Sequence, residues 1–204
     1  MKRINILFGG PAGSGPNILT HLTASALFKS GFFVFYSRDY QSLIRGGHNF
    51  NVLTFSDKQI SSNDSSFDII VAFDKRTVEE HKKNLKKEGI VVEPEKGKGN
   101  MYYAGKLFRT LGLSFKNLDK ELKDLGSRYD ENLKEAKIGF ESEDKILKLS
   151  LKNSKNSSKG SFLNGSQGIS QGALDSGLDI YYAYPMTPAT PVLTELVQAT
   201  LDKK

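Results

Sequence analysis

Apolar runs and helix-spaced apolar positions alternate along the first 140 residues of the chain. Arg3–Phe8 is a short apolar run that ends at a pair of glycines, which is typical of a buried parallel strand. Phe32–Ser37 is a second such run. The stretch between them ends at Gly31 and places four apolar residues at helical spacing: Ile18, Leu22, Ala26 and Leu27. This order predicts a β-α-β unit with a glycine-rich turn before the helix.

The alternation continues beyond this unit. Three more runs predict strands: Phe50–Ser56, Phe67–Asp74 and Gly89–Glu93. Charged segments with regularly spaced apolar residues predict three helices: Thr77–Lys87, Asn100–Leu111 and Asp119–Lys137. Five leucines in or beside the last two helices are core candidates: Leu107, Leu111, Leu118, Leu122 and Leu125. The pattern therefore predicts an α/β layered domain with a mainly parallel sheet over residues 1–140.

A polar segment follows this domain. The second half of residues 141–160 consists of Lys, Asn, Ser and Gly, and such a composition cannot bury enough surface to order itself. We interpret the segment as a linker. Residues 161–204 return to a globular composition, but they are too few to form a core of their own. We expect them to be a fragment of a second α/β domain.

Composition and charge narrow the classes of function. The 204 residues carry a net charge of +6, but the lysines alternate with acidic residues, which is typical of solvated helix faces and does not favour nucleic-acid binding. No apolar run approaches the roughly 20 residues that span a bilayer, and the N-terminus does not resemble a signal peptide. We therefore expect a cytoplasmic protein without membrane association. The chain has no cysteine, so it has neither a thiol nucleophile nor thiolate ligands for an iron–sulfur cluster.

The turn GGPAGSG lies between the first predicted strand and helix. Small residues there let backbone N–H groups approach a phosphate at the helix N-terminus. Gly10, Gly13 and Gly15 form a G-x-x-G-x-G spacing, with Ser14 inside it, which is the reverse of the dinucleotide fingerprint. Pro16 stands where a P-loop needs lysine, so a nucleotide triphosphatase is not expected. Two interpretations stay open: a phosphate or pyrophosphate site, or a tight turn without a ligand.

A second polar loop, YQSLIRGGHN, carries a guanidinium beside a glycine pair. Its candidate residues are Arg45, Gly46, Gly47, His48 and Asn49. A flexible loop with an arginine can close on an anion, and the alternative is a solvated hairpin. The three histidines are scattered without the spacing of metal ligands, so no metal site is expected.

The stretch YPMTP places Thr187 between two prolines just before an apolar helical pattern. Pro188 favours an extended backbone at Thr187. The Thr187 hydroxyl is thus a candidate to donate to a carboxylate, or to cap the helix that follows.

Taken together, these segments resemble the gamma domain of the 2-oxoacid:ferredoxin oxidoreductases of the pyruvate and 2-oxoglutarate type. The resemblance rests on GGPAGSG, YQSLIRGGHN, DIIVAFD and an N-x-x-x-A-G-x-L-x-x-x-L-G pattern over Asn100–Gly112, in that order. YAYPMTPAT resembles the Tyr-Pro-Ile-Thr-Pro signature near the start of the family's alpha subunit, with Met186 in place of the isoleucine. Several members fuse gamma to the N-terminus of alpha, and the chain resembles such a fusion.

The resemblance implies a function. The family oxidatively decarboxylates a 2-oxoacid with thiamine diphosphate and Mg²⁺, passes electrons through iron–sulfur clusters to ferredoxin, and transfers the acyl group to coenzyme A. It implies that Thr187 contacts the substrate. It also implies that the glycine turn and the Arg45–Asn49 loop contact coenzyme A.

Two features depart from the whole enzyme. The alpha subunit should continue for several hundred residues after Thr187, so we expect a truncated alpha segment over residues 161–204. Neither a Gly-Asp-Gly thiamine signature nor any cysteine occurs, so we expect thiamine diphosphate and the clusters on partner chains, among them the beta subunit. The chain alone should be inactive. The alternatives are a non-catalytic gamma-type module that binds a phosphorylated ligand or docks to a partner, and an inert truncation product.

Overall fold

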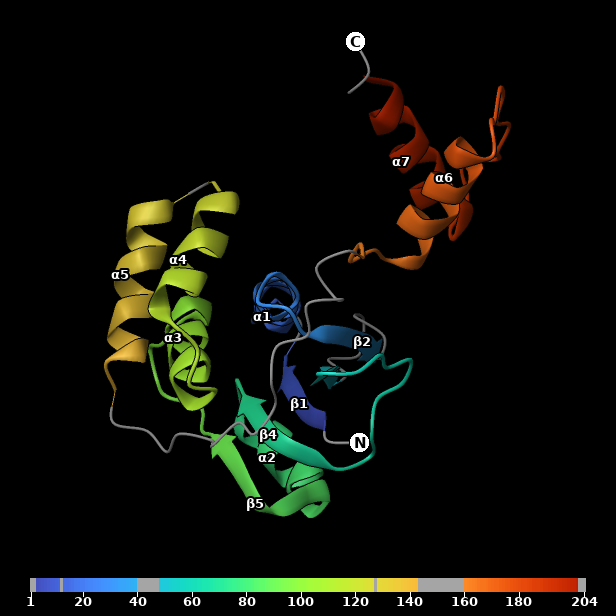
Figure 1. Ribbon diagram of the computed structural model, residues 1–204. Helices are drawn as coiled ribbons and strands as arrows, with labels where there is room; N and C mark the ends of the chain where they lie inside the picture. Colours follow the sequence, from blue (N-terminus) through green and yellow to red (C-terminus); the bar gives the residue numbers. More distant parts are fainter. Residues whose placement is uncertain (1–2, 12, 40–47, 127, 143–159, 202–204) are drawn as a thin grey trace. The chain divides into compact units, whose positions relative to one another are not determined.

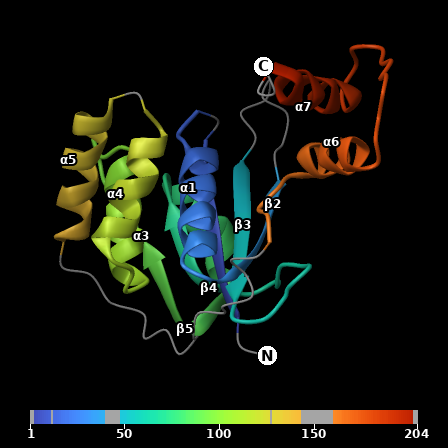
Figure 2. The ribbon, with the colours of Figure 1, turned by 45° about the horizontal axis from the view of Figure 1, so that its top comes forward.

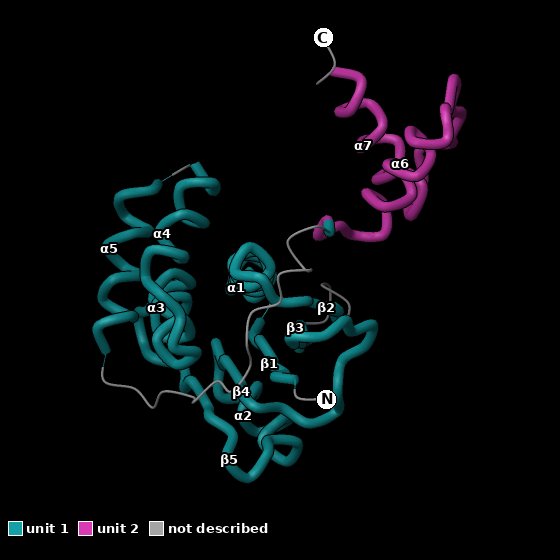
Figure 3. The backbone as a smooth tube through the Cα atoms, viewed as in Figure 1, with its two compact units in different colours: residues 1–160 teal, residues 161–204 magenta. Residues whose placement is uncertain are grey.

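The chain forms two compact units, residues 1–160 and residues 161–204 (Figure 3). The computed structural model describes residues 3–11, 13–39, 48–126, 128–142 and 160–201. Most of the expected linker, residues 143–159, lies outside these ranges.

The first unit contains a five-stranded sheet with the order β2-β3-β1-β4-β5 (Figure 1). Its strands are β1 (Arg3–Gly10), β2 (Phe33–Asp39), β3 (Asn49–Ser56), β4 (Phe67–Ala72) and β5 (Leu85–Val92). β1 pairs in parallel with β4, and β4 with β5, whereas β3 is antiparallel to both β1 and β2. The α/β class is confirmed, and four of the five strands point the same way. β3 reverses because the segment between Asp39 and Asn49 is shorter than the dozen or more residues of a parallel crossover.

Helices cover both faces of this sheet. α1 (Pro16–Lys29) packs on β1, β2 and β3, beside the helices α3 (Asn100–Thr110), α4 (Phe115–Asp124) and α5 (Tyr129–Phe140), as Figure 2 shows. α2 (Lys75–His81) packs on β1 and β4. Because successive residues of a strand face opposite sides, Leu7 of β1 joins the α2 side with Val52 and Ile70, and its neighbours Ile6 and Phe8 face α1.

The α1 face of the sheet contains a buried polar link. Asn51 of β3, 3% exposed, donates from Nδ2 to Asn17 Oδ1 at 2.9 Å and to Thr20 Oγ1 at 3.0 Å. Thr20 in turn donates to the carbonyl of Pro16 at 2.7 Å. These bonds fix the start of α1 against β3.

Helices α3 and α5 cross at two glycines. A Cβ added at Gly105 would meet the carbonyl oxygen of Ala136 and would lie 2.6 Å from the backbone nitrogen of Phe140. A Cβ added at Gly139 would lie 2.8 Å from the carbonyl carbon of Tyr102. The two backbones are therefore in direct contact, which only glycine permits at these positions.

Two predicted helices have different boundaries in the structure. The helix expected over Asp119–Lys137 is two helices, α4 and α5, because Gly126 adopts a positive φ of 72° between them. The helix expected over Thr77–Lys87 ends at His81 and passes through a 3₁₀ turn, η2 (Lys82–Asn84), into β5. Pairing with β4 thus overrides the helical pattern of Leu85–Lys87.

The predicted core residues are mostly buried. The prediction for Leu125 is wrong, since it is 41% exposed, and Ile18, one of the four helix-spaced apolar residues of α1, is 48% exposed. The others lie in the core, with exposures of 3% or less: Leu22, Ala26, Leu27, Leu107, Leu111, Leu118 and Leu122.

The second unit is a helix pair. α6 (Gly165–Asp175) begins with a capping box between Asn164 and Gln167, and α7 (Ala189–Leu201) packs against it through the buried side chains Val192 and Leu196. Ser170 of α6 donates to the carbonyl of Val192 at 3.1 Å. None of the described helices is long and apolar enough to cross a bilayer.

Candidate functional site

The glycine turn after β1 is held by short internal bonds. Ser14 donates to the carbonyl of Pro11 twice, from its backbone nitrogen at 3.1 Å and from its hydroxyl at 2.7 Å. Gly13 and Gly15 have positive φ angles of 84° and 97°. Gly10 is forced by packing, since a Cβ there would lie 2.7 Å from Phe73 Cβ and from the Ser14 hydroxyl. The turn therefore needs glycine at three positions, two because of a positive φ and one because of close packing.

Gly15 is also the N-cap of α1 and supplies no side-chain oxygen. The helix then begins with Pro16, which has no N–H, followed by Asn17 and Ile18. The first-turn N–H groups of a helix have no acceptor within the helix, so those of Asn17 and Ile18 are available to an anion. No acidic residue stands in this first turn to compete for that position.

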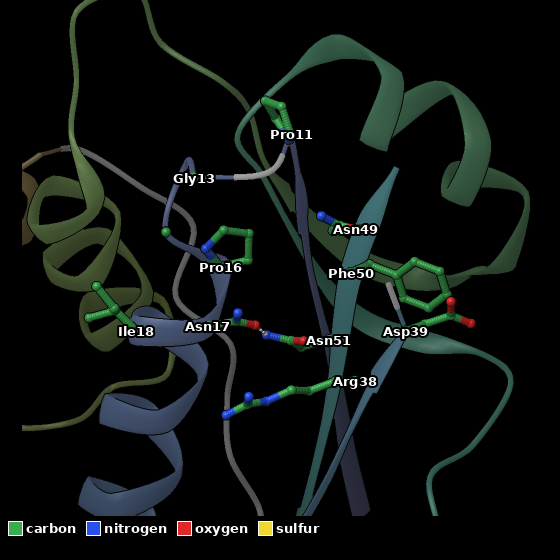
Figure 4. Close-up of a pocket in the computed structure, with 11 residues that line it drawn as sticks. Pro11, Gly13, Pro16, Asn17, Ile18, Arg38, Asp39, Asn49, Phe50 and Asn51 are labelled. Carbon is green, nitrogen blue, oxygen red and sulfur yellow. Dashed lines mark hydrogen bonds between the residues drawn. The ribbon is translucent and has the colours of Figure 1, made fainter. Parts of the chain in front are cut away.

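A cavity of about 490 Å³ opens at this helix end (Figure 4). It is lined on one side by the turn and the start of α1, and on the other by β2 and β3. The lining residues are Pro11, Gly13, Gly15, Pro16, Asn17, Ile18, Arg38, Asp39, Asn49, Phe50 and Asn51. Two segments that the sequence suggested for anion binding, the glycine turn and the Asn49 end of the polar loop, thus meet at one cavity.

Among the described lining residues Arg38 supplies the cation, and the sequence analysis did not identify it. Its guanidinium donates to the Tyr36 hydroxyl at 3.0 Å and lies 5.6 Å from the centre of that ring. Asp39 adds a carboxylate to the cavity lining. In Figure 4 the Arg38 side chain points toward α1, whereas Asp39 points away from it. A group bound between α1 and β3 would therefore face the Arg38 guanidinium and not the Asp39 carboxylate.

A second hollow of about 440 Å³ adjoins the first and shares Asn17, Ile18 and Arg38 with it. It runs along α1 toward α4. Lys29 lines it and bridges Glu121 at 2.9 Å and Asp124 at 2.8 Å. The hydrogen bonds to Asp124 and Glu121 raise the pKa of Lys29 above its ordinary value. Together the hollows form an elongated space with Arg38 at the junction.

Two residues predicted from the polar loop lie on opposite faces of the sheet. Asn49 lines the cavity, but His48, 3% exposed, lies on the α2 side of the sheet. Its Nε2 is 2.9 Å from Nε2 of His81, the last residue of α2. Burial of the ring, and then the neighbouring His48, lower the pKa of His81 below its ordinary value. The fold thus brings together two histidines that are scattered along the sequence.

Three other predicted residues, Arg45, Gly46 and Gly47, lie outside the described residues. Thr187 belongs to the second unit and is exposed. Its hydroxyl does not cap α7: the backbone nitrogens of Ala189 and Thr190 instead donate to the carbonyl of Met186, at 2.8 and 3.2 Å. The hydroxyl is therefore open to another acceptor.

Residues 5–98 match the family model described as pyruvate ferredoxin/flavodoxin oxidoreductase. These residues, somewhat less than half of the chain, are similar to that family. A 2-oxoacid:ferredoxin oxidoreductase subunit alpha from a Sulfolobus species is 37% identical over 79 residues, which are 39% of this chain and 12% of that protein. The subunit alpha of 2-oxoacid:ferredoxin oxidoreductase 1 from Sulfurisphaera tokodaii is 35% identical over 79 residues. The matched segment thus spans only about an eighth of the length of these relatives.

Two solved structures share the fold. The 2-oxoglutarate:ferredoxin oxidoreductase from Magnetococcus marinus, with 2-oxoglutarate, coenzyme A and succinyl-CoA bound, is similar over 100% of this chain and 42% of its own, with a TM-score of 0.80 and 19% identity. The gamma subunit of a keto/oxoacid ferredoxin oxidoreductase from Geobacter sulfurreducens is similar over 69% of this chain and 96% of its own, with a TM-score of 0.59 and 19% identity.

Proposed function

We propose that this chain is a subunit, or part of a subunit, of a cytoplasmic 2-oxoacid:ferredoxin oxidoreductase, and that its cavity binds coenzyme A. The enzyme would oxidatively decarboxylate a 2-oxoacid to the acyl-CoA and pass the electrons to ferredoxin. The observation that carries the proposal is the single cavity in which the glycine turn, the N-terminus of α1 and Arg38 converge.

Each part of the cavity suits a different part of coenzyme A. The free N–H groups of the first turn of α1 suit one phosphate of the diphosphate, and Arg38 suits a second phosphate oxygen by a charge-assisted bond. Ile18, which is 48% exposed, offers an apolar surface between the two hollows. Contact with a ligand would account for the exposure of this apolar side chain.

The remaining parts of the reaction belong to other segments. The chain has no cysteine and no Gly-Asp-Gly stretch, so its residues do not fit an iron–sulfur cluster or the Mg²⁺–diphosphate of thiamine. We place these groups on partner chains, with the beta subunit as the thiamine-binding partner and ferredoxin as the acceptor. In this arrangement residues 1–140 are the gamma-type domain, residues 161–204 begin an alpha-type domain, and the Thr187 hydroxyl donates to the 2-oxoacid carboxylate.

Calorimetric titration of coenzyme A into the whole chain tests the cavity. Arg38→Gln should weaken binding about tenfold, because it removes a charge-assisted contact of about 1.5 kcal/mol. Lys83→Ala is the matched control, since Lys83 lies in the turn after α2, and its affinity should stay within about twofold of the parent. Adenosine 3′,5′-diphosphate should compete with coenzyme A, and pantetheine should not.

Binding that is unchanged in Arg38→Gln would refute the assignment of the cavity. If the isolated chain does not bind coenzyme A, the same variants are compared in a complex with the beta subunit. Equal KM values for coenzyme A in the parent and Arg38→Gln complexes would then refute it.

A further inference from the structure

Three metal-ligating side chains meet on the α2 side of the sheet, and the proposed coenzyme A site uses none of them. They are His48, Glu80 and His81, whose ligand atoms all lie within 4.8 Å of one another. His48 precedes β3, whereas Glu80 and His81 are the last two residues of α2. The cluster therefore joins His48 to two residues that lie more than thirty positions later in the chain.

We propose that His48 Nε2, His81 Nε2 and a Glu80 carboxylate oxygen bind one divalent transition-metal ion of the zinc type. Zinc–nitrogen bonds of 2.0–2.1 Å at a tetrahedral angle place two imidazole nitrogens about 3.3 Å apart. The two Nε2 atoms are 2.9 Å apart. A few tenths of an ångström of ring movement thus admits the ion between them.

Aromatic rings hold the two imidazoles in position. His48 stacks on Phe50 with ring centres 5.8 Å apart, and the edge of Phe50 meets His81 at 4.7 Å. Phe67 approaches His81 from another side at 6.2 Å. This apolar surround lowers the rotational freedom of both ligands and limits access of water to one side, as in protein metal sites with fixed ligands.

Glu80 lies on the open side of the cluster. Its Oε1 accepts from Arg76 Nε at 2.5 Å, one helical turn earlier on α2. That bond orients the carboxylate and leaves Oε2 for the ion, which is the outer support that metal-binding carboxylates usually have. Because Glu80 is exposed, the ion would keep a coordination position for water or for a ligand from outside.

The hydrogen bonding of the pair without an ion is incomplete. Two neutral imidazoles that face each other through Nε2 make one hydrogen bond, in which one ring donates and the other accepts. A metal ion would use the Nε2 lone pairs of both rings at once.

The donor set selects the class of ion. Two imidazoles and one carboxylate suit zinc, cobalt and nickel, whereas Mg²⁺ and Ca²⁺ prefer oxygen ligands alone. The bound ion would tie α2 to the start of β3. His48 also lies against Gly9, since a Cβ at Gly9 would lie 3.2 Å from His48 Cε1. The ion would therefore also steady the end of β1 from which the glycine turn begins.

Zinc binding to the whole untagged chain tests the proposal, with competition against a chromophoric chelator as the measurement. One Zn²⁺ per chain is expected. His81→Gln should weaken binding by about 100-fold or more, because even outer-shell changes cost about 10- to 100-fold. Glu80→Gln should weaken it by about tenfold or more. His21→Gln is the control, since His21 lies on α1, outside the cluster, and it should leave the affinity unchanged.

Cobalt provides an independent readout. Co²⁺ should give the visible absorption of a four-coordinate site in the parent and in His21→Gln, and His81→Gln should abolish it. Millimolar Mg²⁺ should not displace the ion. His81 is only half-buried, so we expect His81→Gln to fold. This variant therefore tests the metal site even if the buried His48 cannot be replaced without unfolding the chain. Circular dichroism confirms that each variant is folded. Substoichiometric zinc, or equal affinity in His81→Gln and the parent, would overturn the proposal.

Discussion

Replacing Gly105 by alanine should destabilise the first unit, although alanine is the better helix former. The change gains about 1 kcal/mol of helix propensity. The new Cβ would meet the Ala136 carbonyl oxygen and lie 2.6 Å from the Phe140 nitrogen, so α3 and α5 must separate by about 1 Å to reach van der Waals distance. Both contacting atoms belong to the backbone, so no change of side-chain rotamer can relieve the clash.

The net cost follows from these opposing terms. Overpacking a core by one methylene costs about 1–3 kcal/mol, and a backbone obstacle belongs at the upper end of that range. Subtracting the helix propensity leaves about 2 kcal/mol. For a chain of this length each kcal/mol lowers Tm by about 2–4 °C, so Gly105→Ala should melt about 4–8 °C below the parent.

Thermal unfolding followed by circular dichroism measures this effect, with Gly172→Ala as the control. Gly172 lies in α6, and a Cβ there would meet nothing within 4 Å, so the control should not lower Tm. Gly139→Ala opens the same helix crossing, and the double variant should lose less than the sum of the two single losses. An unchanged or raised Tm for Gly105→Ala would refute the close crossing of α3 and α5.

Three further predictions concern the site and its supports. Gly13→Val should lower the free energy of unfolding by about 1–2 kcal/mol and weaken coenzyme A binding, because valine disfavours the positive φ at this position although a Cβ would meet no neighbour. Gly13→Asn should bind coenzyme A nearly as tightly as the parent, because asparagine tolerates that φ. Asn51→Ala should lower the free energy of urea unfolding by about 1–3 kcal/mol, since it leaves Asn17 and Thr20 without their buried donor, and an effect below about 0.5 kcal/mol would contradict that role. Hydrogen bonding to Lys106, then to Tyr102, lowers the pKa of Glu95, so Glu95→Gln should destabilise the chain at neutral pH. That difference should shrink as pH falls through and below the ordinary glutamate value of 4.5, where the parent also protonates, and a difference that grows in acid would contradict the ion pair.

The sequence predicted most of the strands because their signal is local. Buried strands such as Phe67–Ala72 are almost continuous apolar runs, and burial on both faces of the sheet favours such runs. The β-α-β unit and the helix over Asn100–Thr110 follow from the same kind of pattern. The α4–α5 break at Gly126 was missed because apolar spacing continues across it, although the glycine itself was a usable signal.

The cavity was only partly predictable, for a different reason. Its glycines are visible because their backbone demands are local, but Arg38 and Asn51 become neighbours of the turn only through strand pairing. The polar residue Asn51, directly before the apolar pair Val52–Leu53 in β3, was a local sign that the sequence offered. Thr187 illustrates the limit from the other side: its motif was recognised, yet the described residues around it do not include a partner for its hydroxyl.

The histidine pair depends entirely on how the strands meet. Asn49 pairs with Gly10 across the antiparallel ladder, and Gly9 pairs with Ala72 across the parallel one. The start of β3 and the end of β4 therefore lie beside the C-terminal end of β1, one on each side of it. Neighbouring strand residues face opposite sides, so Asn49 turns to the cavity, while His48 before it turns to α2 and meets His81. A motif that looks like one loop in the sequence thus supplies two sites, one on each face of the sheet, and no spacing rule applied along the chain could separate them.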